Sequence, residues 1–220
     1  VGNRVSAVAG VPEDRFIYYA GAAAGGIWKT EDGGINWQAV FEDQDVHSVG
    51  ALAVSMSDSK IVWAGTGEPH IRSNVTVGDG VYKSTDGGES WEHMGLDATG
   101  RISRIVIHPT DPDIVYVGAL GHAHGPQQSR GVFRTEDGGD TWEHILFADE
   151  DTGVSSLEMD PSNSDIYGRM GLVKFKSLNY EGATVDLQCA VNGCTHPETD
   201  AHLAGLPLDH MTLEYYYTYA

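Results

Sequence analysis

The sequence predicts an all-β protein built from repeated four-stranded antiparallel sheets. Three observations lead to this prediction: an eight-residue segment that recurs three times, a strand pair that recurs ahead of each copy, and the absence of helical hydrophobic periodicity across these repeats. The repeats are about fifty residues long, a period typical of supersecondary units that must stack on one another to bury their hydrophobic faces.

The recurring segment, called the box below, occupies residues 30–37, 84–91 and 135–142. Every copy contains Asp-Gly-Gly and ends in tryptophan, with large β-forming residues before and after it. Glycine adopts positive φ without steric cost, and aspartate can accept hydrogen bonds from the amides that follow it. Each box therefore predicts the corner of a β-hairpin.

A second module lies ahead of each box and aligns without a gap at residues 5–21, 49–65 and 102–118. In its third copy, two apolar runs flank a turn of proline and aspartate that follows His108, which reads as strand, turn, strand. Together with the two strands around the box, the module gives four short antiparallel strands per repeat. That unit is the blade of a β-propeller.

The boxes resemble Asp-box repeats, also called BNR repeats, whose pattern is Ser/Thr-x-Asp-x-Gly-x-Ser/Thr-Trp. All three copies fit, except that Asn36 replaces the Ser/Thr of the first. Residues 62–68 and 105–109 are similar to the sortilin-type and xyloglucanase-type branch of that family. The resemblance covers about residues 1–167 and implies that the boxes hold turns and bind nothing. The box residues with this structural role are Asp32, Gly34, Trp37, Asp86, Gly88, Trp91, Asp137, Gly139 and Trp142.

The repeats become irregular after the third box. A fourth copy begins at Val154, but its second strand is expected to shorten to 166–168 and no fourth box follows. Residues 171–174 echo a third strand only faintly, so residues 168–220 form an unassigned, β-rich C-terminal segment. About three and a half blades cannot close a ring of four to eight, and an exposed blade edge would remain at each end. We expect the missing blades to come from oligomer assembly or from elsewhere.

Both cysteines lie in this C-terminal segment. Asn192-Gly193 signals a two-residue hairpin turn, which would place Cys189 opposite His196 rather than opposite Cys194. That register disfavours an unstrained disulfide but leaves open both a disulfide through another loop and free thiols. A zinc site built from these cysteines and the nearby histidines would match no common ligand spacing.

The charge of the chain excludes one class of partner. Its formal net charge is −19 with only 13 lysines and arginines, whereas a phosphate backbone is bound chiefly by those residues. We therefore expect no nucleic-acid partner, and no apolar run is long enough to span a bilayer. We expect an extracellular or periplasmic location, although no signal peptide is recognisable.

The long connections predict where a ligand would bind. In an up-and-down blade, the boxes share one end with the proline and aspartate turns, and the longer polar loops gather at the other end. Loops on a rigid scaffold commonly carry function. The ligand-binding candidates are Glu68, His70, Arg72, His122, His124 and Arg130.

Metal and cofactor signals are weak. His122 and His124 alternate in a glycine-bounded loop and could ligate a metal, but no third ligand is identified. Residues 149–153 begin like a calcium loop and lack its later ligands. We expect no cofactor, with calcium as the alternative.

Three functions remain open. The first, and the one we favour, is a non-enzymatic binding or scaffold propeller that presents its loops to a protein, peptide or glycan. The second is a glycoside hydrolase, which usually needs two carboxyl groups flanking the scissile bond; Glu68 with Asp43 or Asp45 is the candidate set. The third is a structural protein that assembles through open blade edges.

Overall fold

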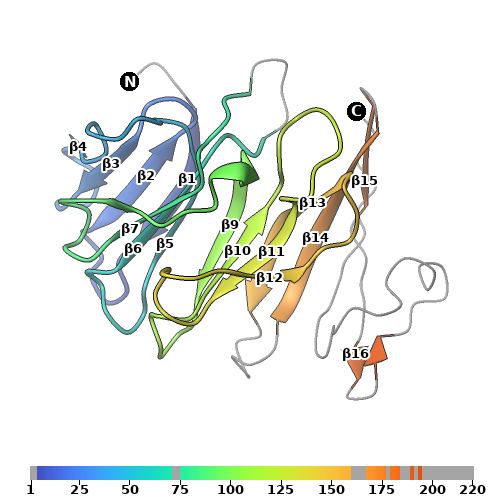
Figure 1. The fold of residues 1–220 in the computed structure, drawn as a ribbon. Coiled ribbons are helices and arrows are strands. Elements are labelled where there is room, and N and C mark those ends of the chain that lie inside the picture. Colours follow the sequence, from blue (N-terminus) through green and yellow to red (C-terminus); the bar gives the residue numbers. More distant parts are fainter. Residues whose placement is uncertain are drawn as a thin grey trace.

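The computed structural model describes residues 4–70 and 75–159, and beyond them the backbone of four strands between residues 167 and 194. The strands form successive antiparallel sheets that follow one another across the molecule, from the blue N-terminal strands to the orange β14 and β15 (Figure 1). Besides strands, the described residues contain one three-residue 3₁₀ helix, η1 (Asp97–Thr99).

Three sheets have four strands each, hydrogen-bonded in sequence order, and are called blades 1 to 3. Blade 1 comprises β1 (Val5–Gly10), β2 (Tyr18–Ala22), β3 (Ile27–Thr30) and β4 (Gln38–Ala39). Blade 2 comprises β5 (Val49–Val54), β6 (Val62–Thr66), β7 (Val81–Ser84) and β8 (Glu92–His93). Blade 3 comprises β9 (Ile102–Ile107), β10 (Val115–Ala119), β11 (Gly131–Thr135) and β12 (Glu143–Leu146). The predicted four-stranded antiparallel repeats are confirmed.

In the part of the chain that the structure describes, blade 4 has three strands: β13 (Thr152–Met159), β14 (Tyr167–Lys176) and β15 (Asn179–Ala183). The prediction that its second strand shortens to 166–168 was wrong, because β14 pairs with the full length of β13 despite the glycines in its sequence. Residues 171–174, read as an echo of a third strand, belong to β14. This strand crosses the boundary placed after residue 167.

A small hairpin follows, made of β16 (Cys189–Ala190) and β17 (Gly193–Cys194). Its register pairs Cys189 with Cys194 and Ala190 with Gly193. This register differs from the one that the Asn-Gly signal indicated. The prediction that Cys189 lies opposite His196 was wrong.

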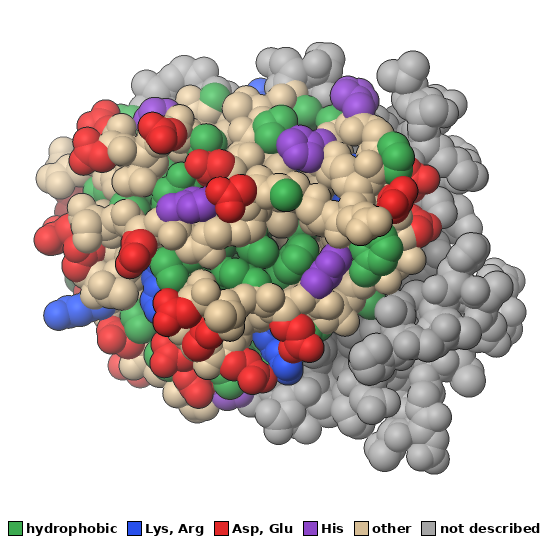
Figure 2. Space-filling model, viewed as in Figure 1, with side chains coloured by type: hydrophobic (Ala, Val, Ile, Leu, Met, Phe, Trp, Pro, Cys, Tyr) green, Lys and Arg blue, Asp and Glu red, His purple; other side chains and the backbone are tan. Residues whose placement is uncertain are grey.

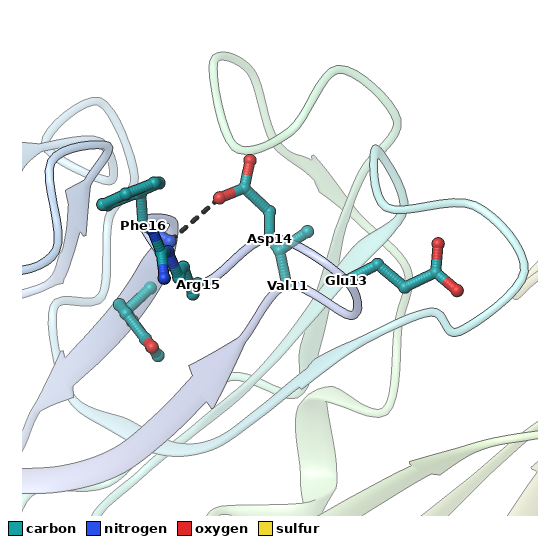
Figure 3. A pocket seen from close by; sticks show the side chains of 6 residues that line it. Val11, Glu13, Asp14, Arg15 and Phe16 are labelled. Atoms are coloured by element: carbon teal, nitrogen blue, oxygen red, sulfur yellow. Dashed lines mark hydrogen bonds between the residues drawn. The ribbon is translucent and has the colours of Figure 1, made fainter.

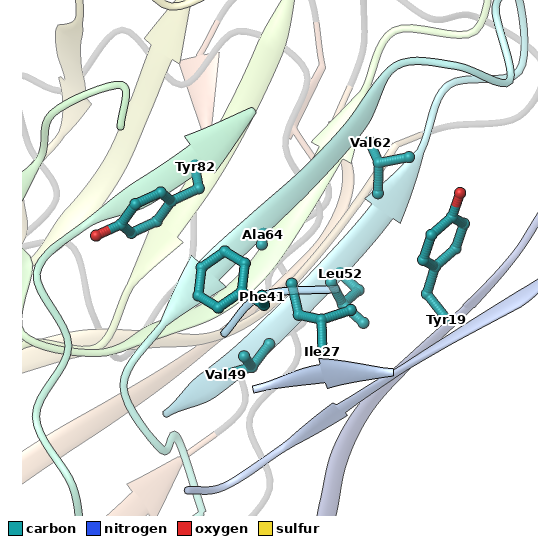
Figure 4. Close-up of a cluster of buried hydrophobic side chains, with 8 residues drawn as sticks. All are labelled: Tyr19, Ile27, Phe41, Val49, Leu52, Val62, Ala64 and Tyr82. Atoms are coloured by element: carbon teal, nitrogen blue, oxygen red, sulfur yellow. The ribbon is translucent and has the colours of Figure 1, made fainter. Parts of the chain in front are cut away.

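The hydrophobic core lies between the blades rather than within them. Between blades 1 and 2, side chains of both sheets form one buried cluster (Figure 4), made of Tyr19, Ile27, Phe41, Val49, Leu52, Val62, Ala64 and Tyr82. Between blades 2 and 3, the corresponding cluster is Ala51, Trp63, Val81, Ile102, Ile105, Val115, Val117 and Ala119. Blade 2 thus buries one face against blade 1 and the other against blade 3, as stacked repeats require.

Candidate functional site

The two ends of the blades have different chemistry. At one end, the amide of the first box glycine donates to the carbonyl of the turn between the first two strands of the same blade. These bonds are Gly33 N to Phe16 O, Gly87 N to Lys60 O and Gly138 N to Asp113 O, each 2.9–3.0 Å long. The boxes therefore lie beside the turns between the first and second strands in all three blades. We call this the box end.

Inside each box the aspartate organises the turn. One oxygen of Asp86 accepts hydrogen bonds from the amides of Glu89 and Ser90, both at 2.9 Å, and from the Ser84 hydroxyl at 2.8 Å. Its other oxygen accepts the Ser90 hydroxyl at 2.5 Å. The Ser84 hydroxyl in turn accepts the amide of Gly88 at 2.7 Å. The carboxylate is occupied by its own turn.

These bonds favour the charged carboxylate. Chiefly through hydrogen bonds from Ser90, the pKa of Asp86 is lowered to about 2, and bonds from Asn36 lower that of Asp32 to about 2. Bonds from Thr141 and Thr135 lower the pKa of Asp137 as well. A group whose pKa is depressed in the folded state stabilises the fold above its unfolded pKa, and that stabilisation disappears as the pH falls through the folded pKa.

The free energy of unfolding is therefore expected to fall between about pH 4 and pH 2 as the boxes protonate. Asp86→Asn should lower stability at pH 6 and make its decline toward pH 2 shallower than in the wild type. Urea unfolding across this pH range measures both effects. Asp140→Asn, which removes an exposed carboxylate of the third box, is the matched control. Identical pH profiles for Asp86→Asn and the wild type would contradict the assignment.

The opposite end, called the loop end, is formed by two kinds of connection. They are the loops between second and third strands, at 67–80 in blade 2 and 120–130 in blade 3, and the inter-blade connections at 40–48, 94–101 and 147–151. Backbone bonds join each loop to the connection that follows it: Gly26 N to His47 O, Gly78 N to Gly100 O and Gln127 N to Glu150 O. The predicted separation of boxes from long loops follows from this strand order.

Glu68 occupies a buried position at the loop end. Its side chain is only 2% exposed and is ion-paired with the guanidinium of Arg4, 64 residues earlier in the sequence. Its amide donates to the carbonyl of Thr76 at 2.9 Å. By contrast, Asp43 and Asp45 are exposed on the connection between blades 1 and 2. The sequence placed these three carboxylates together, but the structure gives them different surroundings.

The other predicted ligand-binding residues are distributed along the two long loops. His70 is exposed just after Glu68, and Arg72 lies outside the described residues. His124 is exposed, whereas His122 is partly buried with its ring close to Gly100. The amide of His122 donates to the side-chain oxygen of Gln127 at 2.8 Å.

Arg130 is fully buried and holds the loop of blade 3 through hydrogen bonds to its backbone. Its guanidinium donates to the carbonyls of Leu120 at 2.7 Å, His122 at 3.0 Å and Gly125 at 3.2 Å. Burial lowers its pKa, and the charges of Asp151 and Asp149 oppose that shift. The sequence indicated Arg130 as a ligand-binding residue. In the structure its guanidinium bonds to the backbone of the loop.

Replacing Arg130 by methionine is expected to loosen the loop at 120–130, because three carbonyls lose their donor while most of the side-chain volume is kept. Amide hydrogen exchange should accelerate about tenfold or more in this loop, since each lost bond contributes about 1 kcal/mol or more. The exposed Arg104→Met is the control. Unchanged exchange in Arg130→Met would show that the guanidinium does not hold the loop.

Two further arrangements were not apparent in the sequence. Arg101 is fully buried and its Nε donates to the carbonyl of Gly121 at 2.6 Å, linking an inter-blade connection to the loop of blade 3. The carbonyl preceding each third strand also has a side-chain donor. These donors are Trp28 to Gly25 in blade 1, His93 to Asp79 in blade 2 and His144 to Arg130 in blade 3, at 2.7–2.8 Å. Aligning the repeats by their boxes would have shown that both histidines hold the same position.

Within the described residues, no group of three or more histidine, cysteine, aspartate or glutamate side chains is arranged to hold a metal ion. His122 and His124 therefore gain no third ligand there. In the segment read as the start of a calcium loop, the side chain of Asp149 accepts the amide of Asp151 at 2.9 Å, and Glu150 accepts from the Gln128 amide group at 3.3 Å.

The surface is strongly acidic, and aspartates and glutamates far outnumber lysines and arginines on the face shown in Figure 2. An open hollow of about 620 Å³ lies at the hairpin between β1 and β2, on the box end of blade 1 (Figure 3). It is therefore remote in topology from the loop-end candidates. In the part of the chain that the structure describes, no helix is long and apolar enough to cross a membrane.

Solved structures with the same arrangement of sheets are β-propellers. The chain is similar to an ancestral GH74 enzyme, with a TM-score of 0.54 and 18% identity over 83% of this chain and 26% of that one. It is also similar to YCF48 bound to D1 peptide, with a TM-score of 0.55 and 15% identity over 98% of this chain and 55% of that one. The four sheets are β-propeller blades. At these identities the likeness establishes the fold alone.

One curated relative matches in sequence. The chain is 25% identical over 160 residues to a probable oligoxyloglucan-reducing end-specific xyloglucanase of Neosartorya fischeri. The match covers 69% of this propeller chain and 18% of that protein, so this chain spans less than a fifth of the relative's length. No protein-family model matches the chain.

Proposed function

We propose that this chain is a non-enzymatic binding or scaffold propeller that presents its loop end to a protein, peptide or glycan. The observation that carries the proposal is that two buried charged side chains hold the loops: Glu68 is ion-paired with the exposed Arg4, and Arg130 donates to the loop of blade 3. Exposed polar residues such as His70 and His124 remain available above them. A surface held rigid in this way loses little conformational entropy when a ligand binds.

The placement of the carboxylates disfavours hydrolysis. Glycosidases usually need two carboxyl groups that both reach the scissile bond. Glu68 is buried and paired with a cation, so its carboxylate would have to leave Arg4 to reach a sugar. Arg4 is itself 40% exposed, so the pair is partly buried, and a Glu68 carboxylate that left it would give up its cation. Asp43 and Asp45 are exposed. In the candidate catalytic pair, however, either of them would have to act together with Glu68.

A glycoside hydrolase remains the second candidate, because the curated relative is a probable xyloglucanase and one similar structure is a GH74 enzyme. The peptide-bound YCF48 structure is similar in fold and favours the binding proposal to the same degree. We further propose that the boxes are Asp-box repeats of the sortilin-type or xyloglucanase-type branch. The extracellular or periplasmic location and the absence of a cofactor other than calcium belong to this proposal.

Binding is tested by screening peptide and glycan libraries against the wild type and a loop-end variant carrying Asp43→Ala, His70→Ala and His124→Ala. We expect the variant to lose at least tenfold in affinity for any ligand found. A box-end variant carrying Thr85→Ala, Glu89→Ala and Asp140→Ala removes exposed side chains from the other end and should bind normally. Equal affinity of the loop-end variant and the wild type would remove the loop end as the site.

The hydrolase alternative has its own measurement. Incubation with xyloglucan oligosaccharides should release no product beyond the buffer control if the chain only binds. Turnover by the wild type that falls by orders of magnitude in Glu68→Gln would instead establish the enzyme and overturn the binding proposal.

A further inference from the structure

Blade 1 has a face that no other part of the described chain covers. It carries Val5, Val8, Tyr18 and Trp37, which are exposed by 61%, 74%, 40% and 39%. We call these four side chains the outer face of blade 1. We propose that it is the docking surface for one further blade of the same repeat, one whose second strand carries an aromatic residue and a glycine at the positions described below.

The internal repeat shows what covers this position elsewhere. Val5 and Val8 correspond to a pair of apolar residues three positions apart on the first strand of every later blade. These pairs are Val49 and Leu52 in blade 2, Ile102 and Ile105 in blade 3, and Val154 and Leu157 in blade 4. All six side chains are at most 9% exposed, because each pair packs against the preceding blade. The exposed pair of blade 1 therefore has the chemistry of an inter-blade contact.

The first residue of each pair packs against a glycine on the second strand of the preceding blade. A Cβ added at Gly21 would lie 2.5 Å from Val49 Cγ1, and one added at Gly65 would lie 2.4 Å from Ile102 Cγ2. Gly118 repeats the contact with Val154 at 2.9 Å. Only a residue without a side chain permits so close an approach. The blade that covers Val5 should therefore have glycine at this position.

The hydrogen bonds of the box tryptophans also indicate that blade 1 lacks a preceding blade. The indole nitrogens of Trp91 and Trp142 donate to carbonyls of the preceding blade, Val40 O at 2.8 Å and Met94 O at 2.7 Å. In blade 1 the indole of Trp37 instead donates to the carbonyl of Gly34 in its own box at 3.0 Å. The indole N–H that bonds to the preceding blade in blades 2 and 3 therefore bonds within its own box in blade 1.

An aromatic side chain of the preceding blade also covers each later box. Tyr19 packs on Gly88 and its hydroxyl donates to the carbonyl of Gly87 at 2.7 Å, and Trp63 packs on Gly139. An added Cβ at Gly34 would meet only Trp37 of the same box within 4 Å. The second strand of the docking blade should therefore carry aromatic-x-Gly, as residues 19–21, 63–65 and 116–118 do.

These features restrict the partner to a surface with a particular arrangement of residues, and a hydrophobic surface alone would not satisfy them. The second-strand glycine and aromatic residue lie at fixed positions, and the partner also offers a carbonyl to the indole of Trp37. The hollow of Figure 3 adjoins this face through Tyr18, which lines both. A further blade supplies all of these contacts at once.

The test places a copy of residues 49–101 directly ahead of Val5 in the otherwise complete chain. This junction reproduces the natural step from Arg101 to Ile102, so the copied blade 2 should cover blade 1 as it covers blade 3. Hydroxyl-radical footprinting with mass spectrometry should show labelling of Val8 about eightfold lower, the ratio of its exposure, 74%, to the 9% of Leu52. The labelling of Tyr18 and Trp37 should fall with it.

A control chain carries Trp63→Asp and Gly65→Val in the added copy only, leaving the original blades intact. Labelling of Val8 should then return to the level of the unmodified chain. Unchanged labelling of Val8 in the extended chain with the intact copy would overturn the proposal. It would also be overturned if the unmodified chain formed concentration-dependent dimers in which Val8 is already protected, because the face would then belong to a second copy.

Discussion

Trp63→Ala is expected to lower the free energy of unfolding by about 3–5 kcal/mol, the range for removing a large buried aromatic side chain. The indole is fully buried between blades 2 and 3, edge-on to Trp142 with ring centroids 5.9 Å apart. The ammonium of Lys83 lies 5.5 Å from its ring centroid. Its loss would leave a cavity at the box of blade 3 and remove both contacts. Urea unfolding followed by circular dichroism measures the change.

Trp37→Ala is the control. It removes the same type of side chain, but from the outer face of blade 1, which no described blade covers. It is expected to cost clearly less than Trp63→Ala, since a side chain that is 39% exposed loses less buried area than one that is fully buried. Equal losses for the two variants would contradict the assignment of Trp63 to an inter-blade interface.

Gly65→Ala is expected to lower the free energy of unfolding by about 1–3 kcal/mol, the usual cost of overpacking a core. The added methyl would lie 2.4 Å from Ile102 Cγ2 and 2.6 Å from Ile102 Cβ, so the two blades would have to separate. The cost arises between the sheets, because the backbone of Gly65 does not need positive φ.

Gly10→Ala is the corresponding control. A Cβ at Gly10 meets only the ring edge of Tyr18 at 3.2 Å, and that side chain is exposed and can move aside. Its effect should lie within about 0.5 kcal/mol of zero. A Gly65→Ala variant as stable as Gly10→Ala would show that the blades do not approach as closely as described.

The sequence was sufficient for blades 1 to 3 because their strand ends are set by local chemistry that recurs. The box aspartates bond their own following amides, and the first box glycine has positive φ in each copy, as at Gly87. Such turns fold in the same way wherever they occur, and three copies in register remove most of the ambiguity.

Blade 4 and the cysteine hairpin were predicted less well because pairing over a distance determines them. β14 is ten residues long because β13 pairs with its residues 167–174 and β15 pairs with its residues 172–176. The register of β16 and β17 pairs Cys189 with Cys194, whereas the Asn-Gly signal predicted His196 as its partner. A local turn preference is weaker than the register that the adjoining strands adopt.

The loop end was predictable as a location, because strand order alone decides which turns share an end. The roles of individual residues were not. Glu68 and Arg130 were chosen as polar loop residues, yet both are buried, and the partner of Glu68 lies 64 residues away at Arg4. Burial and long-range pairing depend on how the blades stack, which no local motif reports.

The most direct test of blade-on-blade stacking is a double-mutant cycle between Gly65 and Ile102, on adjacent blades. Ile102→Ala removes the Cγ2 atom that the methyl added by Gly65→Ala would strike, so the double variant should be more stable than the sum of the single effects by about 1 kcal/mol or more. Urea unfolding of the four proteins gives this coupling energy. Effects that add to within about 0.3 kcal/mol would mean that the two strands are not in contact, and would contradict the stacked-blade structure.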